Sequence, residues 1–431
     1  MRCLPVRLAL AAALHTLPVG GICPAVAAEV APVDAWPTDT NQIQRLTLEQ
    51  ARKLAAEFPG VTVPGKFPSM SSRWIGCLPL NGLKSLDVAT AQALAEFKGR
   101  SLYFNGLTRL EADTAQALAG FKGRLHLDGL TTLEPATARA LAKFKGDGLD
   151  LDGLATLDVA TATALAEFKS GTLALNGLTT LDADAARALA EFKGRGDLQL
   201  NGLTTLDADA ARALAEFKGR DDLQLNGLTT LDADTAKPLA DSKAWNGALP
   251  KLTTLDAETA KALADSKAWN GRLPKLTMLD AATARALAEF RGQALVLDAL
   301  TTLDADAARA LVEYKGRYLS LNGLTMLDAD TAKALAPLDI WNGNLSSIVA
   351  FESPDSVVIA AALATRKSPL SLRNLKKISP KTLAALIEKE DVEIPPIETL
   401  ELIPEPDGSP TEDFVIPEGF ESGPKTREQG R

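Results

Sequence analysis

Two neighbouring segments of this chain carry the same amino-acid sequence. Residues 175–195 and residues 200–220 both read LNGLTTLDADAARALAEFKGR, and variants of this sequence recur from about residue 43 to residue 400. A chain made of similar units of this size is typical of a solenoid, because each unit is too small to bury its own apolar face and must stack on its neighbours. We therefore expect one small motif to be stacked many times.

The period of the repeat is 23 to 25 residues through its regular part. The glycine of an Asn-Gly-Leu step, or the residue that replaces it, marks each copy. These markers lie at positions 82, 106, 129, 153, 177, 202, 227, 251, 275, 299 and 323, with weaker copies at 347, 374 and 396. A half-copy at 43–60 is separated from the array by an insertion at 61–77.

Each copy predicts a short strand, a turn and a helix. Leucines at alternate positions, such as Leu223 and Leu225, place two side chains on one face of a strand. Asp207 is expected to cap the following Ala-rich helix, and Lys218 and Gly219 to end it. Three apolar residues at helical spacing are expected to form the buried stripe of that helix: Ala210, Leu214 and Phe217.

The spacing L-x-L followed by L-x-x-L at a period near 24 residues resembles leucine-rich repeats. The resemblance covers nearly the whole chain up to Leu402, and it implies an α/β solenoid with a parallel sheet on its concave face, a surface typically used for protein recognition. The spacing of strands and helices agrees, since strands lie about 4.8 Å apart and helices about 8–10 Å apart, so the strands should take the inner side. One feature departs from the family pattern: Asn176, Asn201 and Asn226 follow the L-x-L step immediately. We expect an equivalent ladder of side chains at this shifted position.

The first 28 residues predict a secretory signal peptide. Arg2 and Arg7 precede a short apolar stretch at 8–14, and 25–28 offer a cleavage site of small residues. The apolar stretch is shorter than the ~20 residues that a membrane span needs, and no later stretch is apolar enough. The expected organisation is a signal peptide at 1–28, an N-terminal cap at 29–77, the repeat solenoid at 78–402 and a disordered tail at 403–431. We expect an exported protein that is periplasmic, secreted or on the cell surface.

Composition excludes several classes of function. Loss of Arg2 and Arg7 with the signal peptide takes the formal charge from -9 to -11, and a chain with interspersed charges is a poor binder of nucleic acid. The mature chain keeps Cys77 and His126 as its only cysteine and histidine. It offers no paired-cysteine metal spacing, no HExxH and no Gly-rich phosphate loop. We expect no catalytic residues, no metal and no cofactor.

Two rows of repeated polar residues have structural explanations. A carboxylate ladder could bind calcium, but one Asp per helix start is also ordinary capping, which we favour. The paired threonines, such as Thr204 with Thr205, cannot both face one surface in an extended chain, so we interpret them as turn residues. The capping row consists of Asp182, Asp207, Asp232, Asp256, Asp280, Asp304 and Asp328.

The outward residue of each strand, three before the marker, varies while the leucines beside it hardly change. Plain solvent exposure would explain this variation, but the same face is where repeats of this kind bind ligands. Tyr103, His126 and Asp150 fall on consecutive units and combine an aromatic ring, an imidazole and a carboxylate. We therefore predict a ligand-binding site centred on these three residues, with Tyr103 as an interface anchor.

Two units replace the usual core phenylalanine with serine and add a tryptophan three residues later: Ser242 with Trp245, and Ser266 with Trp269. The tryptophans could refill the space that phenylalanine leaves, since an empty site would cost about 3–5 kcal/mol. Alternatively, Trp245 and Trp269 could form an exposed aromatic pair that binds a glycan or a peptide. Burial of both rings would eliminate this second interpretation.

The ends of the array carry their own signals. Thr47 and Gln50 predict a capping box at the first helix, and Ser353-Pro354 and Ser379-Pro380 predict the starts of the last two helices. In the tail, an apolar island at 414–420 is expected to strap the last unit, or else to dock a partner. The sequence as a whole predicts a non-catalytic scaffold that binds a protein through its concave strand face. The alternatives are a structural spacer of the cell envelope and a glycan-binding edge.

Overall fold

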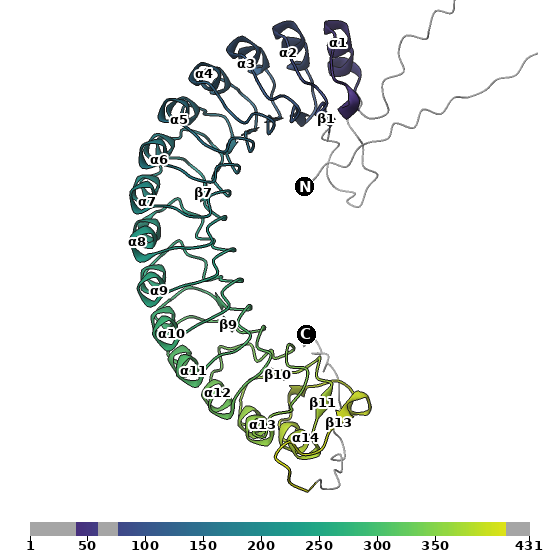
Figure 1. Ribbon diagram of the computed structural model, residues 1–431, viewed down its shortest axis with the longest axis vertical. Helices are drawn as coiled ribbons and strands as arrows, with labels where there is room; N and C mark the ends of the chain where they lie inside the picture. Colours follow the sequence, from purple (N-terminus) through teal and green to yellow (C-terminus); the bar gives the residue numbers. More distant parts are fainter. Residues whose placement is uncertain (1–39, 59–75, 411–431) are drawn as a thin grey trace, which may run out of the picture. The chain divides into compact units, whose positions relative to one another are not determined.

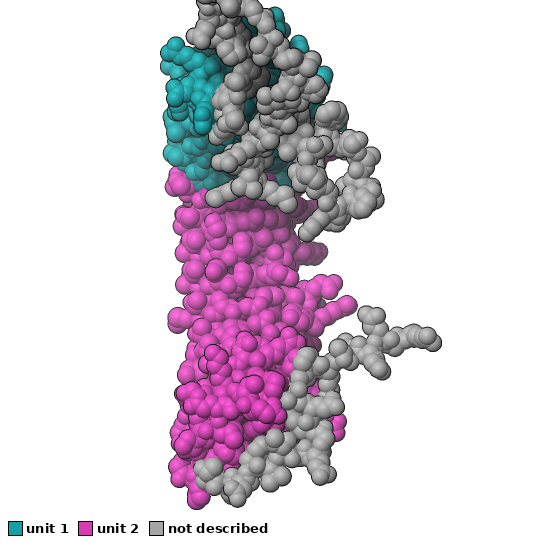
Figure 2. All heavy atoms as spheres, turned by 90° about the vertical axis from the view of Figure 1, so that its right-hand side faces the viewer, with its two compact units in different colours: residues 1–178, 192–198 teal, residues 179–191, 199–431 magenta. Residues whose placement is uncertain are grey.

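The computed structural model describes residues 40–58 and 76–410. The chain divides into two compact units, which Figure 2 shows in different colours. Unit 1 consists of residues 1–178 and 192–198, and unit 2 of residues 179–191 and 199–431. The predicted signal peptide at 1–28 and nearly all of the insertion at 61–77 lie outside the described residues.

Unit 1 alternates short strands with helices of seven to ten residues. Its helices are η1 (Thr40–Gln42), α1 (Leu48–Glu57), α2 (Val88–Leu94), α3 (Ala112–Leu118), α4 (Pro135–Leu141) and α5 (Val159–Ala166). Its strands are β1 (Cys77–Pro79), β2 (Ser101–Tyr103), β3 (Arg124–His126), β4 (Gly148–Asp150) and β5 (Thr172–Ala174). A further strand, β6 (Leu198–Gln199), contains the boundary between the units.

The strands of unit 1 pair in parallel and in constant register, so that equivalent residues of successive repeats are Cα partners. Their central leucines are fully buried: Leu78, Leu102, Leu125, Leu149 and Leu173. In Figure 1 the strands of this unit lie on its concave side and the helices on the other side. We call one such strand, turn and helix a coil, and we call the side of the strands that points away from the leucine core the strand face.

Unit 2 continues the same pattern with shorter strands. Its helices are α6 (Ala183–Ala190), α7 (Ala208–Ala215), α8 (Ala233–Asp241), α9 (Ala257–Ala264), α10 (Ala281–Ala288), α11 (Ala305–Val312), α12 (Ala329–Leu335), α13 (Ser356–Ala364), α14 (Pro380–Ile387) and η2 (Ile397–Thr399). Its strands are β7 (Leu223–Gln224), β8 (Leu295–Val296), β9 (Leu319–Ser320), β10 (Leu370–Ser371), β11 (Lys377–Ile378), β12 (Val392–Glu393) and β13 (Glu401–Leu402). The expected α/β solenoid with a leucine-rich-repeat-like coil is confirmed.

Helix capping explains the repeated aspartates. Each Asp of the predicted capping row precedes a helix, and its side chain accepts a hydrogen bond from the backbone N–H three residues further on, which satisfies one of the open donors of the first turn. The capping interpretation is therefore confirmed. The threonines also have structural roles, since Thr229 and Thr253 donate their hydroxyls to the backbone of the preceding coil, at Thr204 and Thr229.

The helices end earlier than the sequence predicts. In α7 the last residue is Ala215, and Phe217 donates its N–H to the carbonyl of Leu214, three residues back, at 3.0 Å. A tight turn of this type closes the helix without a left-handed residue. Lys218 and Gly219 lie beyond the helix, and Gly219 does not adopt a positive φ. The predicted buried stripe is confirmed, with Leu214 fully buried and Phe217 9% exposed.

A ladder of side-chain oxygens joins successive coils at the position immediately after the L-x-L step. In unit 1, each of these oxygens accepts a hydrogen bond from the backbone N–H of the equivalent residue one coil later. The accepting side chains are those of Asn41, Asn81, Asn105, Asp128 and Asp152, and the N–H of Asn176 is the last donor. In unit 2, Asn201 with Asn226 and Asp298 with Asn322 make the same bond. The expected ladder at the shifted position is therefore confirmed.

Two of the three predicted helix starts at the ends of the array are confirmed. Thr47 forms a capping box with Gln50, and Ser379 caps α14 with Pro380 as the first helical residue. The third prediction is wrong, because α13 begins at Ser356. There the N–H of Asp355 bonds to the Ser353 side chain at 3.3 Å, so that Ser353 holds a turn before the helix.

The tail does not begin at residue 403 as predicted. Ile403 donates its N–H to the carbonyl of Ile378 at 3.1 Å. Glu405 is 5% exposed, and its carboxylate accepts a hydrogen bond from the N–H of Lys381 in the first turn of α14, where negative charge is favourable. Ile403, Glu405 and Ser409 therefore attach this stretch to the last coil, Ser409 through a hydrogen bond from Lys381 Nζ. The rest of the tail, including the apolar island at 414–420, lies outside the described residues.

Candidate functional site

The strand face of unit 1 carries two residues from each strand, the first and the third. These residues point away from the leucine core because successive side chains of a strand alternate between its two faces. The third position holds Pro79, Tyr103, His126, Asp150 and Ala174, and the first position holds Cys77, Ser101, Arg124, Gly148 and Thr172. Tyr103, His126 and Asp150 are direct neighbours across the parallel register.

Tyr103 and His126 form a stacked pair. Their ring centroids are 3.9 Å apart, and the two planes are inclined by only 5°. Constant register brings the two rings to the same level of adjacent strands, and strands lie about 4.8 Å apart, which is close to a stacking distance. The two rings therefore lie face to face, and each covers one face of the other.

His126 also contacts the carboxylate of the next strand. Its Nδ1 lies 2.7 Å from Oδ2 of Asp150, and the side chains of the two residues are 13% and 10% exposed. A histidine whose Nδ1 is held by a carboxylate has its ring orientation fixed. Nε2 of His126 is buried and has no hydrogen-bond partner among the described residues.

Arg124 completes the cluster, although the sequence analysis did not select it. Its guanidinium Nη1 lies 3.2 Å from Oδ1 of Asp150. The guanidinium reaches this carboxylate across the backbone of Gly148, where an added Cβ would come within 2.7 Å of the Arg124 Nε. Only glycine leaves this space. Arg124 stands two residues before His126 and therefore on the same face, so strand alternation is the signal that could have identified it.

We refer to Tyr103, His126, Asp150 and Arg124 as the strand-face cluster. A ladder carboxylate lies close to it in sequence and space. Burial raises the pKa of Asp128, and the negative charges of Asp152 and Asp150 act in the same direction, whereas a backbone hydrogen bond from Asp152 and the charge of His126 lower it. The surroundings of the cluster are thus partly desolvated, which strengthens its charged contacts.

The chemistry of the cluster favours binding over catalysis. A His–Asp pair can serve as a general base when a nucleophile lies within hydrogen-bond reach of the imidazole. Among the described residues, no serine, threonine or cysteine side chain is recorded in hydrogen-bond contact with His126. No group of three or more His, Cys, Asp and Glu residues in the described part of the chain could hold a metal ion. What the cluster offers is a stacked aromatic pair beside an arginine that is paired with Asp150.

The predicted tryptophan pair does not lie on a surface. Trp245 and Trp269 are each 3% exposed, and Trp269 packs against Phe290 of the next coil with ring centroids 4.5 Å apart. The tryptophans refill the space left by Ser242 and Ser266, which is the first of the two interpretations that the sequence left open. The hypothesis of an exposed aromatic pair is wrong, and with it the glycan-binding edge at these residues.

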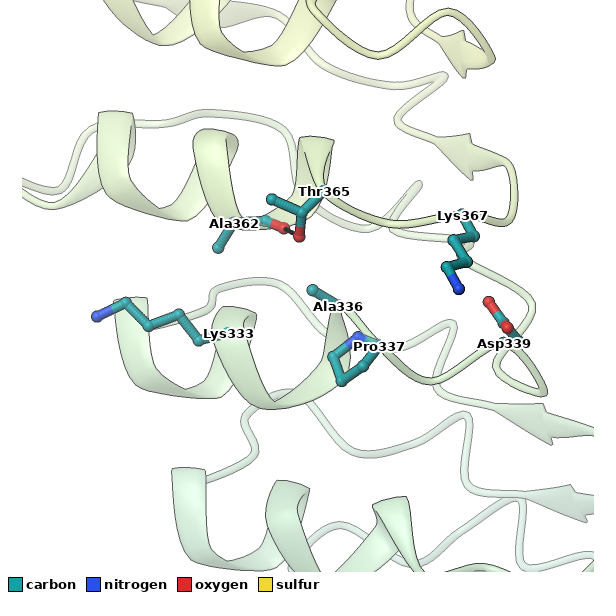
Figure 3. Close-up of a pocket in the computed structure, with 7 residues that line it drawn as sticks. All are labelled: Lys333, Ala336, Pro337, Asp339, Ala362, Thr365 and Lys367. Carbon is teal, nitrogen blue, oxygen red and sulfur yellow. Dashed lines mark hydrogen bonds between the residues drawn. The ribbon is translucent and has the colours of Figure 1, made fainter.

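A small pocket between α12 and α13 is a weaker candidate (Figure 3). Its volume is about 340 Å³, and it is lined by short side chains, Pro337 and two lysines. Both lysines have acidic neighbours: Lys333 lies 3.3 Å from Asp330, and Lys367 points toward the carboxylate of Asp339. Because its charges are already matched, this pocket has little to offer a charged ligand.

Comparison with solved structures returned several repeat proteins. An internalin from Listeria monocytogenes is 16% identical over 74% of this chain and 85% of that chain, with a TM-score of 0.41. A chain of the TLR13–ssRNA13 complex is 16% identical over 76% of this chain and 54% of that chain, at 0.39. A chain of the Drosophila Toll–Spätzle complex is 15% identical over 75% and 44%, at 0.38. This chain thus spans about half the length of the last two.

A scan against protein-family models and a search of curated proteins found no match. The described residues contain no helix long and apolar enough to cross a membrane. With TM-scores below 0.5, the similar structures carry no inference about ligand or partner. The fold rests on the repeated coil itself, and the chain has a leucine-rich-repeat-like architecture.

Proposed function

We propose that this protein is an exported, non-catalytic scaffold that binds another protein through the strand face of unit 1. The observation that carries the proposal is the strand-face cluster. Four side chains from three consecutive strands form a continuous network on the face that a repeat fold leaves for a ligand. No comparable mixture of aromatic, imidazole, carboxylate and guanidinium groups occurs elsewhere along the predicted outward row.

The composition of the cluster suits a protein partner. Tyrosine and arginine are over-represented among the residues that dominate binding energy at protein interfaces. The stack on His126 and the ion pair with Asp150 hold Tyr103 and Arg124 in place before a partner arrives. A pre-ordered surface loses less side-chain entropy on binding, so more of the contact energy remains as affinity.

The test compares the proteins captured by the mature chain and by two triple variants. Tyr103→Ala, His126→Ala and Asp150→Ala together remove the site. A matched control combines Arg187→Ala, Arg212→Ala and Arg309→Ala, which remove exposed side chains from α6, α7 and α11. We expect a partner that is captured by the parent and the control and lost by the site variant. Equal capture by all three proteins would contradict the proposal.

A structural spacer is the second candidate, and the two identical segments favour it. If length alone matters, deletion of residues 200–224, one full period of the repeat, should leave activity in the cell intact apart from a shorter reach. Under the binding proposal this deletion, which leaves the strand-face cluster untouched, should also be tolerated, whereas Tyr103→Ala should not. The single substitution therefore separates the two candidates.

Export is tested separately. N-terminal sequencing of the protein recovered from the periplasm or the medium should begin near residue 29. Recovery of a chain that still begins at Met1 from the cytoplasm would contradict this part of the proposal and leave the binding proposal standing.

A further inference from the structure

Ion pairs between coils follow a rule on the helix side of the molecule. A lysine just after one helix pairs with a glutamate at the end of the preceding helix. The rule holds for Lys193 with Glu167, Lys218 with Glu191 and Lys315 with Glu289. The first two pairs have N–O distances of 2.6 Å.

A second rule acts within helices. A basic residue in the middle of the helix pairs with an aspartate three residues before it, in the first turn. The pairs are Arg187 with Asp184, Arg212 with Asp209, Arg309 with Asp306 and Lys333 with Asp330. Together the two rules give most exposed cations of these coils an acidic partner.

Both rules fail together around α4, whereas α10 breaks only the second, because Ala282 stands three residues before Arg285 while Glu289 is kept. Where other coils carry the glutamate, residues 120 and 143 are Gly120 and Lys143, so Lys145 and Lys169 have no carboxylate at the position where Lys193 and Lys218 find one. Ala136 stands where Asp184 stands in α6, so Arg139 has no partner three residues before it. Three carboxylates that the repeat supplies elsewhere are missing within one stretch.

The four cations left over line a single groove. Arg139, Lys143, Lys145 and Lys169 line a space of about 770 Å³ between α4 and α5. In the described part of the chain none of the four has an acidic partner within ion-pair distance. The one carboxylate in the lining, Glu167, is engaged by Lys193 at 2.6 Å.

The remaining lining is apolar or small. It includes Ala142, Ala160, Ala164 and the edge of Phe144, which is 2% exposed. Cations at helix C-termini are favourable for the helix alone, but that effect is worth only about 0.3–1 kcal/mol and applies equally to the coils that also supply a glutamate. The helix-end effect therefore explains why a lysine follows each helix. It does not explain why the carboxylates are missing at residues 120, 136 and 143.

We propose that the groove between α4 and α5 binds a multiply charged anion of the phosphate or sulfate type. Four cationic side chains converge on one space, and each can donate charge-assisted hydrogen bonds to anionic oxygens. Long lysine side chains adapt to a tetrahedral group without a rigid preformed geometry. The site lies on the helix side of unit 1, away from the strand-face cluster, and is independent of the proposed protein-binding function.

The experiment measures binding of inorganic pyrophosphate to the full mature chain by calorimetry at low ionic strength. Two variants restore the rules of the repeat: Lys143→Glu supplies the carboxylate opposite Lys169, and Gly120→Glu supplies the one opposite Lys145. Gly120 is exposed, and an added Cβ there would meet only the Ala95 methyl, at 3.9 Å, so this variant should fold normally. Each substitution should weaken binding at least tenfold.

A charge-matched pair provides the control. Lys145→Gln and Lys315→Gln remove one positive charge each from the same repeat position, directly after the core ring, but only Lys145 lines the groove. We expect weaker binding for the first and unchanged binding for the second. Equal losses for both would show general attraction to positive charge, and equal affinity of Lys143→Glu and the parent protein would also overturn the proposal.

Vesicles distinguish the source of the anion. A second arm measures co-sedimentation with vesicles that contain phosphatidic acid, whose phosphomonoester headgroup carries up to two negative charges, against vesicles of phosphatidylcholine alone. Binding to the anionic vesicles that is lost in Lys143→Glu would identify a lipid headgroup, and pyrophosphate binding alone a soluble ligand. If neither probe binds in a Lys143-dependent way, the site does not exist, whereas capture of a protein partner at the strand face would be unaffected.

Discussion

The two units close the helix side of their coils with different side chains. In unit 1 every described coil uses phenylalanine, and the rings of Phe58, Phe97, Phe121, Phe144, Phe168 and Phe192 follow one another with centroids 6.2 to 6.4 Å apart. In unit 2 the same repeat position holds Phe217, Ser242, Ser266, Phe290, Tyr314, Leu338, Arg366 and Lys389. All of these residues are nevertheless buried.

Unit 2 compensates for each replacement with a local device. Trp269 fills the place of the ring beside Ser266. Arg366, 3% exposed, donates hydrogen bonds to the carbonyls of Leu338, Trp341 and Pro369 and lies 4.6 Å from the Trp341 ring. A buried cation is tolerated there because each of the three guanidinium nitrogens donates to a carbonyl. The comparison teaches that this buried position must be filled and that any polar group there must be hydrogen-bonded. Phenylalanine is only the simplest side chain that meets both conditions.

The largest expected effect comes from removing a core phenylalanine ring in unit 1. Phe144→Ala should lower the free energy of unfolding by about 3–5 kcal/mol, because Phe144 is packed between the rings of Phe121 and Phe168. Phe144→Leu should cost less than about 1.5 kcal/mol, since unit 2 uses Leu338 at the equivalent position. Urea unfolding of both variants tests the comparison, and equal losses would contradict it.

The next effect comes from placing the phenylalanine of unit 1 at an equivalent position of unit 2. Ser266→Phe should destabilise the protein by about 1–3 kcal/mol, because Trp269 already occupies the space and the serine hydroxyl loses its bond to the carbonyl of Ala240. The double variant with Trp269→Ala should recover much of this loss.

A double-mutant cycle measured by urea unfolding quantifies the coupling between residues 266 and 269. We expect an interaction energy of at least about 1 kcal/mol. If the effects of the two substitutions simply add, Trp269 does not replace the missing ring.

Helix caps give a smaller contrast. Asp207 caps α7, whereas Glu134, at the equivalent position before α4, makes no side-chain capping bond. Asp207→Ala should cost about 1 kcal/mol, and Glu134→Asp should gain about 0.5 kcal/mol. Thermal unfolding of the two variants should therefore move in opposite directions, and a loss for Glu134→Asp would show that the longer side chain has a role of its own.

The smallest effect concerns the ladder. Because burial raises the pKa of Asp128 in the folded state, the folded protein holds this proton more tightly than the unfolded chain does. Its contribution to stability is therefore greatest at acid pH and declines as the pH rises through the folded-state pKa. Asp128→Asn keeps an oxygen for the N–H of Asp152 and removes this dependence.

We expect Asp128→Asn to match the parent protein in stability near pH 3 and to exceed it slightly at pH 7, by less than about 1 kcal/mol for a partly exposed group. Urea unfolding at the two pH values provides the measurement. A difference in stability that does not change with pH would show that the Asp128 carboxyl has the same pKa in the folded and unfolded chain, and would contradict this prediction.

The sequence predicts those features of the fold that depend on position within one repeat. The capping aspartates, the ladder and the leucine core follow from period and residue type, and the structure contains all three. The helix ends and the start of the tail were missed, since a 3₁₀-like turn after Ala215 and the bond from Lys381 to Glu405 involve backbone geometry that residue types do not encode. The burial of Trp245 was left open for the same reason.

The candidate site was predicted in part. Strand register follows from the period, so the neighbours Tyr103, His126 and Asp150 could be found. To find Arg124, one must also recognise that its side chain crosses Gly148 to reach Asp150. This path is open because residue 148, one coil later, has no Cβ. The groove beside α4 could be predicted only with knowledge that a lysine pairs with the glutamate of the preceding coil. The sequence of a single repeat does not reveal this pairing.

The ladder bonds also have a consequence for how the chain reaches its folded state. Each bond in unit 1 from Asn81 onwards joins residues 23 or 24 positions apart. A polypeptide that emerges from a ribosome at about 5–20 residues per second releases one such span in a few seconds, long compared with the time in which helices and short loops form. Each new coil can therefore dock on the coil made just before it. Assembly can proceed in the direction of synthesis, and no contact in the ladder has to wait for the far end of the chain.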